Sequence, residues 1–273
     1  MPIEHKVINQ DGAVVYLPKN SNVEGLPNLA EPDPYVDTVS QAYPLGTRAV
    51  IGERVYHYGK ASSDGITTPG RLAQNGSVYN DDGLQDSHEG SSTAVAIAVG
   101  DKSIIYTDTN SSHVANWFRR GWLIAFYSAT TYTLQILSNT AAGTTMTVTM
   151  VDGFPLIDAN GALFATIHQS IYSQMRNRAA GFSTQAATVG AALKAFTASY
   201  FGWIQSWGPC YVVPYNEEIG ATVGNHDCFF HIDGTIKLET RAAGALHQRA
   251  GYMLNSSSSS TTSTWLIRLM VNK

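Results

Sequence analysis

The residues best suited to bind a metal lie between His226 and Asp233, in the run His-Asp-Cys-Phe-Phe-His-Ile-Asp. Imidazole, thiolate and carboxylate groups are the ligands of zinc sites. In an extended strand, however, successive side chains point to opposite faces, so Cys228 and His231 would point away from each other. A chelating pair must face one side. We therefore predict no metal site here and interpret the segment as a buried thiol beside histidines of a turn.

Cys210 and Cys228 are the only cysteines of the chain. Two cysteines cannot build the disulfide framework of a small secreted scaffold. They could pair across neighbouring strands, but free cysteine is among the most readily buried residue types. We expect two reduced, buried thiols in a protein made in a cytoplasm.

The short motifs that mark common active sites are missing from the sequence. It contains no Gly-x-Ser-x-Gly, no His-Glu-x-x-His, no phosphate-binding loop and no dinucleotide fingerprint. The acidic segment 80–86 does not have the spacing of a calcium-binding loop, and we expect it to be a solvated loop. We predict no catalytic residue, no cofactor and no enzymatic activity. A polysaccharide-cleaving enzyme is an alternative that would need two facing carboxylates, which spacing alone does not identify.

Trp203 and Trp207 belong to the most informative stretch of the chain, residues 201–215. Gly208 and Pro209 interrupt this stretch, which predicts paired strands around a bend because proline cannot donate to a central ladder. Being four residues apart, the two indoles share one face of a strand and could stack against a sugar. No exposed polar cluster accompanies them, which favours burial in a barrel core or at a trimer axis.

The composition excludes several kinds of partner. Charged residues make up 14% of the 273 residues, against about 25% in an average protein. A surface poor in Lys and Glu suits extended, tightly packed interfaces. The net charge of −4 and the scattered Lys and Arg residues offer no basic face, so we expect no nucleic-acid partner. No apolar run reaches the ~20 residues of a membrane span, and the chain start does not look like an export signal, so we expect no membrane partner.

Turn residues and short alternating runs predict an all-β chain with a barrel-like or sandwich-like core and little helix. The expected strands are 14–17, 48–51, 54–58, 93–99, 102–107, 122–127, 131–137, 144–151, 229–232, 235–239 and 265–271. Residues 163–175 have apolar side chains every four positions but many β-branched residues, and we expect a strand followed by a loop. Residues 62–92 are expected to be a loop, and the Ala-rich residues 186–198 to form a helical turn or two.

Two hairpins have specific turn signals. Gly52-Glu53 links two short strands with glycine first, as a type II′ turn prefers, and Asp233-Gly234 favours a type I′ turn. Four prolines within residues 1–42 predict an extended N-terminal arm that gains order from a neighbouring molecule. We expect residues 43–115 to form the first hairpin and a small β lobe, and residues 116–273 the main β-barrel or sandwich domain.

Three segments together resemble the head decoration, or cement, proteins of tailed bacteriophages. They are Tyr-Pro-Leu-Gly-Thr-Arg at residues 43–48 with the following Val-Tyr-His-Tyr-Gly-Lys-Ala hairpin, Gly-Trp-Leu-Ile at 121–124 with Tyr-Thr-Leu-Gln-Ile-Leu-Ser-Asn-Thr-Ala at 132–141 and the run from Thr147 to Leu156, and Tyr-Phe-Gly-Trp-Ile-Gln-Ser-Trp-Gly-Pro-Cys at 200–210 with Gln-Arg-Ala-Gly-Tyr-Met-Leu at 248–254. The resemblance covers most of residues 43–255. It implies an all-β homotrimer on the outside of the expanded shell, made in the host cytoplasm, which clamps neighbouring major capsid subunits.

A clamp of this kind needs an interface and no active site. We expect the first hairpin to contact the capsid or a neighbouring subunit, with Arg48, Arg54 and Tyr56 exposed and with Tyr43 and Tyr58 in the same contact. An ordinary hairpin of the β core is the alternative. A second functional hypothesis is a trimeric receptor-binding or tail-fibre head domain that recognises host glycans at Trp203 and Trp207.

Overall fold

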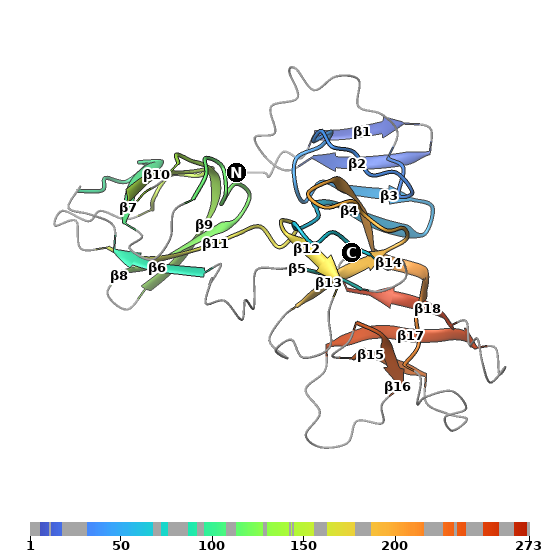
Figure 1. Ribbon diagram of the computed structural model, residues 1–273. Coiled ribbons are helices and arrows are strands. Elements are labelled where there is room, and N and C mark those ends of the chain that lie inside the picture. The colour runs from blue at the N-terminus through green and yellow to red at the C-terminus, as the bar shows by residue number, and fades with distance from the viewer. Residues whose placement is uncertain are drawn as a thin grey trace. The chain divides into compact units, whose positions relative to one another are not determined.

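In the computed structural model, most of the described residues form antiparallel β-sheet (Figure 1). The described residues are 6–10, 12–17, 32–67, 72–75, 87–91, 96–107, 113–127, 130–141, 143, 145–155, 163–177, 187–215, 226–231, 234–238, 248–256 and 265–271. Within these ranges the chain forms strands β1 to β18 and no helix, which confirms the predicted all-β class. No helix that could cross a membrane is found in the same ranges.

The chain divides into two compact units. Unit 1 comprises residues 1–76 and 172–273, and unit 2 comprises residues 77–171. Unit 1 is discontinuous because β5 (Leu72–Asn75) pairs with β12 (Met175–Asn177), so the chain leaves unit 1 after β5 and returns to it at β12. Unit 2 is inserted between these two strands, and the predicted boundary between residues 115 and 116 lies within it.

The first four strands of unit 1 form a meander. They are β1 (Lys6–Gln10), β2 (Ala13–Leu17), β3 (Arg48–Ile51) and β4 (Arg54–Lys60). The hairpin predicted at Gly52-Glu53 is confirmed, and a positive φ of 58° at Gly52 fits the first turn position of type II′. The predicted N-terminal arm contains the two strands β1 and β2, not one, and β2 pairs with β3. This part of the arm therefore gains its order from the chain's own sheet and not from a neighbour.

The longest strand of unit 1, β14 (Phe201–Val212), has 12 residues and three partner strands. Its first half lies between β4 and β13 (Thr188–Ala192), and its second half pairs with β18 (Trp265–Met270). The prediction of two strands around a bend at Gly208-Pro209 is wrong. Pro209 lies beyond the last residue that pairs with β4, where one side of the strand is an edge that tolerates proline.

β14 is shared by two closed rings of paired strands, which we call strand circuits. In the first, β14 continues through β18, β17 (Arg249–Ser256), β15 (Asp227–Phe230) and β16 (Ile236–Leu238), and a parallel bridge between Pro214 and Ile236 closes the circuit. In the second, β14 continues through β13, β5 and β12, and a parallel bridge between Met175 and Ala61 returns to the end of β4. Each circuit surrounds its own buried apolar cluster. This arrangement agrees with the predicted barrel-like core.

Two local predictions fail in this region. Residues 188–192 form the buried strand β13 and not a helical turn, because this Ala-rich, Gly-containing segment packs between β14 and β5, where small side chains fit. Residues 62–92 are not all loop, since they contribute β5 to unit 1 and β6 (Ser87–Ser91) to unit 2. The acidic segment 80–86 lies outside the described residues. The hairpin predicted from residues 229–232 and 235–239 is confirmed as the pairing of β15 with β16. Ile232 and Asp233 in its turn lie outside the described residues, so the predicted type I′ turn stays a prediction.

Unit 2 is a curled six-stranded sheet. Its strands, in spatial order, are β6, β11 (Phe164–His168), β8 (Trp122–Tyr127), β9 (Thr130–Asn139), β10 (Thr145–Met150) and β7 (Ser103–Thr107). The Tyr106 hydroxyl of β7 donates a hydrogen bond of 3.3 Å to the Ala165 carbonyl of β11 across the buried interior. As predicted for residues 163–175, a strand, β11, is followed by a loop, which ends where Met175 begins β12. The strand expected at 93–99 is not formed by its described residues, 96–99.

Candidate interaction surface

The segment from Pro32 to Tyr43 presents three exposed apolar side chains. Tyr35, Val36 and Val39 are 59%, 48% and 69% exposed, and we refer to these three residues as the exposed apolar segment. The segment contains no regular strand, yet side-chain and backbone hydrogen bonds fix it to unit 1 at several points. It is therefore an apolar surface element whose backbone is held by the fold beneath it.

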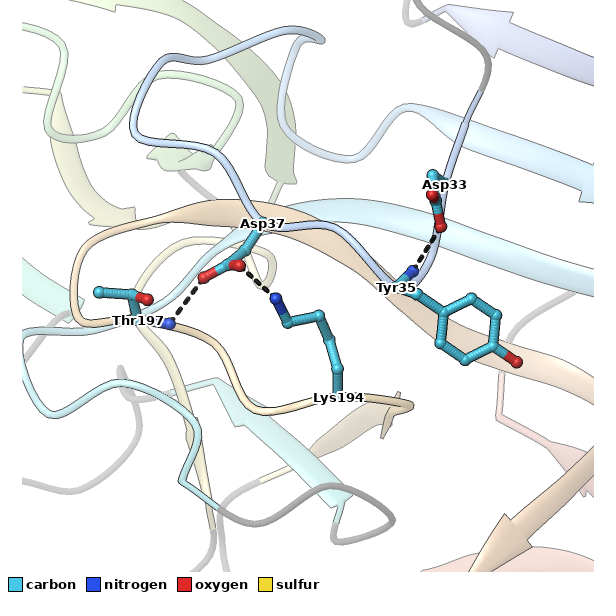
Figure 2. Close-up of polar contacts among 5 residues, drawn as sticks. All are labelled: Asp33, Tyr35, Asp37, Lys194 and Thr197. Atoms are coloured by element: carbon cyan, nitrogen blue, oxygen red, sulfur yellow. Dashed lines mark hydrogen bonds and ion pairs between the residues drawn. The ribbon is translucent and has the colours of Figure 1, made fainter.

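Asp37 is the main polar anchor of this segment. Its carboxylate forms an ion pair with Lys194 and accepts a hydrogen bond of 2.8 Å from the backbone N–H of Thr197 (Figure 2). Burial raises the pKa of the Asp37 carboxyl, and the hydrogen bonds from Lys194 and Thr197 outweigh this effect, so the pKa lies below its ordinary value. The carboxylate is thus charged at neutral pH and ties the segment to the loop that follows β13.

Further contacts hold the segment on both sides of Asp37. The Asp33 carboxylate accepts a 2.8 Å hydrogen bond from the backbone N–H of Tyr35 and so shapes the turn before it, while the Tyr35 ring points away from these contacts (Figure 2). Thr38 and Phe201 exchange two backbone hydrogen bonds of 2.8 Å at the start of β14. The backbone N–H of Ala42 donates to the Tyr58 hydroxyl at 3.0 Å. A partner would bind a surface that is already ordered, which lowers the entropic cost of binding.

The three tyrosines predicted to contact a partner lie in the core. Tyr43, Tyr56 and Tyr58 are each 2% exposed, so the prediction that Tyr56 is exposed is wrong. They belong to one apolar cluster with Trp203, in which the Tyr43 ring centroid lies 5.0 Å and the Tyr58 centroid 5.1 Å from that of Trp203. Strand parity places Tyr56, Tyr58 and Trp203 on one inward face shared by β4 and β14. The Tyr43 ring, from the segment before β3, packs on Tyr58 and Trp203 there. The cluster anchors the exposed apolar segment from below.

Arg54 and Arg48 have different environments. Arg54 is exposed, and its guanidinium hydrogen-bonds the side chains of Tyr56 and Tyr35. It therefore extends the exposed apolar segment with a positive charge. Arg48 is half-buried, with its guanidinium carbon 4.7 Å from the centroid of the Tyr16 ring, which is the geometry of a cation–π contact.

Trp203 and Trp207 do not form a common platform. Trp203 is 3% exposed and lies in the aromatic cluster, as predicted for a core residue. A register shift between Gln205 and Trp207 makes Trp207 pair with Val55, whereas Trp203 pairs with Tyr58. Val55 and Tyr58 have opposite parity on β4, so this bulge turns the two indoles to opposite faces of the sheet. The proposed sugar stack on this pair is therefore excluded in the described fold.

The cysteines and histidines near residue 228 show no metal-binding arrangement. Cys210 and Cys228 are free thiols buried in the cluster inside the first strand circuit, and burial raises the pKa of each to about 12. The Cys228 thiol donates to the carbonyl of His226, and the His231 ring packs on Tyr215 with 4.1 Å between centroids. Among the residues that the structure describes, no three His, Cys, Asp or Glu side chains gather as a metal site. Asp233 lies outside these residues.

Comparisons with known proteins give no relative. No protein-family model, no curated protein and no solved structure matches this chain.

The exposed apolar segment could not be found from sequence, because residues 32–42 carry no periodic pattern. Only their contacts with β14 and with the loop after β13 reveal which side chains remain exposed.

Proposed function

We propose that this protein is a non-enzymatic structural component of a tailed-phage particle that binds the outside of the capsid and clamps neighbouring major capsid subunits. The resemblance of three segments to head decoration proteins supports the identity of the partner. The structural observation that carries the proposal is the exposed apolar segment, which the Asp37 anchor holds on the surface of unit 1. The protein acts as a homotrimer in this proposal.

The chemistry of this surface suits a protein partner. Tyr and Arg are the residue types enriched at the centres of binding interfaces, and Tyr35 and Arg54 hydrogen-bond each other here. Val36 and Val39 add exposed apolar area, and removing this area from water favours binding. Because the segment is fixed before binding, association does not have to order it, which lowers the entropic cost of binding.

Copy number tests the proposal directly. Quantitative mass spectrometry of purified virions compares this chain with the major capsid protein. A copy number of the same order supports the clamp. A few copies per particle would contradict it and favour a receptor-binding or tail-fibre head domain, and absence from the particle would reopen the possibility of an enzyme.

A matched pair of variants tests the surface itself. Val39→Asp places a charge within the exposed apolar segment, and we expect binding to capsids that lack this protein to weaken about tenfold or more. Val99→Asp is the control, because Val99 in unit 2 is similarly exposed, at 62% against 69% for Val39. Equal binding by the two variants would remove the exposed apolar segment from the interface.

A further inference from the structure

The outward face of the unit 2 sheet carries exposed aromatic side chains. Trp122 and Phe126 of β8 are 42% and 41% exposed, and Phe164 of β11 is 45% exposed. Phe164 pairs with Phe126 across the two strands, and their ring centroids lie 5.7 Å apart. Neighbouring residues on these strands, such as Leu123 and Ala165, are fully buried on the opposite, core-facing side. Strand parity therefore places the three rings on the outward face of the sheet, so they are surface residues and not partly exposed core residues.

Trp122 lies between two neutral hydrogen-bonding side chains. It pairs with Gln135 of β9 on one side and with His168 of β11 on the other. Cross-strand partners share a face with Cβ atoms about 5 Å apart. Burial lowers the pKa of His168, so its imidazole is neutral at pH 7 and carries one donor and one acceptor. Its Nε2 lies 3.5 Å from the Thr166 hydroxyl, a long contact on the same face of β11. The indole is thus flanked by amide and imidazole groups that can both donate and accept.

This face carries no charge on its three central strands. Residues 122–127, 130–139 and 164–168 include no Asp, Glu, Lys or Arg. Besides the aromatic rings, the outward positions hold threonines, Gln135 and His168, and Ile124 pairs with Thr133 and Thr166. The charge-free area ends at β11, where Glu89 of β6 is the cross-strand neighbour of Thr166. Within this area a charged ligand would find no counter-charge, whereas a neutral ligand with both apolar and hydroxyl groups is matched by rings and hydrogen-bonding groups together.

The dimensions of the face favour a small ligand over a protein. Three strands about 4.8 Å apart and five residues of about 3.4 Å each cover roughly 14 by 17 Å, or about 240 Å². A stable protein interface buries about 800 Å² on each partner. The charge-free face is several times too small for that, but it can accommodate a few linked sugar rings.

We propose that the surface formed by Trp122, Phe126, Phe164, Gln135 and His168 binds a neutral oligosaccharide. The apolar face of a sugar ring stacks on the Trp122 indole, and its equatorial hydroxyl groups hydrogen-bond Gln135 and His168. Phe126 and Phe164 extend the platform along β8 and β11 for a further ring. This proposal stands on unit 2 alone and does not depend on the proposed role of unit 1 in capsid binding.

The test uses the full chain and a panel of soluble hexasaccharides, namely chitohexaose, cellohexaose and maltohexaose, with binding measured by calorimetry. We expect at least one to bind, and Trp122→Ala to weaken that binding about tenfold or more. Tyr211→Ala is the matched control, since Tyr211 of unit 1 is an aromatic residue of similar exposure, 45%. It should leave the affinity unchanged. Far-UV circular dichroism and the thermal unfolding midpoint verify that each variant is folded.

A second variant separates sugar binding from general apolar adhesion. Gln135→Leu keeps the platform apolar but removes an amide, so a sugar site loses affinity about threefold or more. No binding by any hexasaccharide, or equal binding by wild type and Trp122→Ala, would overturn the proposal. The proposal would also be overturned if Gln135→Leu bound the sugar as tightly as the wild type or more tightly. A change of oligomeric state in Trp122→Ala without any sugar binding would overturn it too, and either result would favour apolar contact with a protein.

Discussion

His57 Nδ1 lies 2.9 Å from Ser206 Oγ inside unit 1, where His57 is 5% exposed and Ser206 is fully buried. The imidazole also stacks on Tyr172, with 4.9 Å between ring centroids and 7° between planes. Burial, with a smaller contribution from the positive charge of Arg48, lowers the pKa of His57 to about 4. The ring is therefore neutral at pH 7, and one hydrogen bond to a serine and one stacked ring hold it in the core.

This histidine should make the protein sensitive to mild acid. The folded pKa of about 4 is below the ordinary 6.5, so the unfolded chain takes up a proton more readily. The contribution of the neutral His57 to the free energy of unfolding is therefore complete above pH 6.5 and is lost as the pH falls toward 4. One pKa unit corresponds to 1.36 kcal/mol, so the loss amounts to about 3 kcal/mol. Urea unfolding at pH 7.5, 5.5 and 4 measures this. In His57→Gln the loss between pH 6.5 and 4 should be smaller, and an equal loss in both proteins would contradict the assignment.

Asp37→Asn should loosen the segment that carries Tyr35, Val36 and Val39. The change removes the ion pair with Lys194, and we expect the free energy of unfolding to fall by roughly 1–3 kcal/mol. Amide exchange at Thr197, which donates to the Asp37 carboxylate, should accelerate. Asp33→Asn is the control, because the exposed Asp33 carboxylate makes a local turn contact with the backbone of Tyr35. Unchanged exchange at Thr197 in Asp37→Asn would show that the carboxylate is not an anchor.

Gly208→Ala should be far more harmful than Gly12→Ala. Both glycines have a φ of 90°, so alanine suffers the same backbone strain at each, about 1 kcal/mol. At Gly12 an added Cβ meets no atom within 4 Å, whereas at Gly208 it meets the backbone of Glu53 and Arg54. Chemical denaturation of the two variants measures the difference. Equal destabilisation would mean that the β3–β4 turn can move away from β14 and relieve the clash with the added Cβ at little cost in free energy.

Cys210 and Cys228 should resist alkylation in the folded protein. Burial raises the pKa of each thiol to about 12, so at pH 8 the reactive thiolate is rare, and the side chains lie inside the first strand circuit. Treatment with iodoacetamide followed by intact-mass measurement should show no adduct before unfolding and two adducts in urea. Rapid labelling of either cysteine in the native state, or failure to label both in urea without a reductant, would contradict two buried free thiols.

Local signals predicted many strands with their bounds, and failed where a segment's pattern was ambiguous. The strand at 122–127 and the hairpin at Gly52-Glu53 follow from alternation and from turn geometry, which neighbouring residues set. The Ala-rich residues 188–192 could be helical or extended by composition, and their place between β14 and β5 decides the matter. Pro209 indicated a break, but an edge position within β14 accommodates it.

The candidate sites depended even more on tertiary contacts. The aromatic residues Tyr43, Tyr56, Tyr58 and Trp122 are similar in type, yet the first three are buried and Trp122 is 42% exposed. Strand parity alone cannot tell which face of a strand is covered, because that depends on segments distant in sequence. A single bulged residue before Trp207 also reversed the face that simple counting predicted.

By itself, the sequence determined the all-β class, the hairpin turn at Gly52-Glu53 and the low charge of the chain, since alternation and turn preferences depend on neighbouring residues and composition depends on residue counts alone. The tertiary structure decided that unit 2 is inserted between β5 and β12, that β14 serves two strand circuits, and which aromatic rings stay outside. These features arise from pairing between strands up to about 150 residues apart, as in β4 with β14, and only the assembled sheets determine what each face covers.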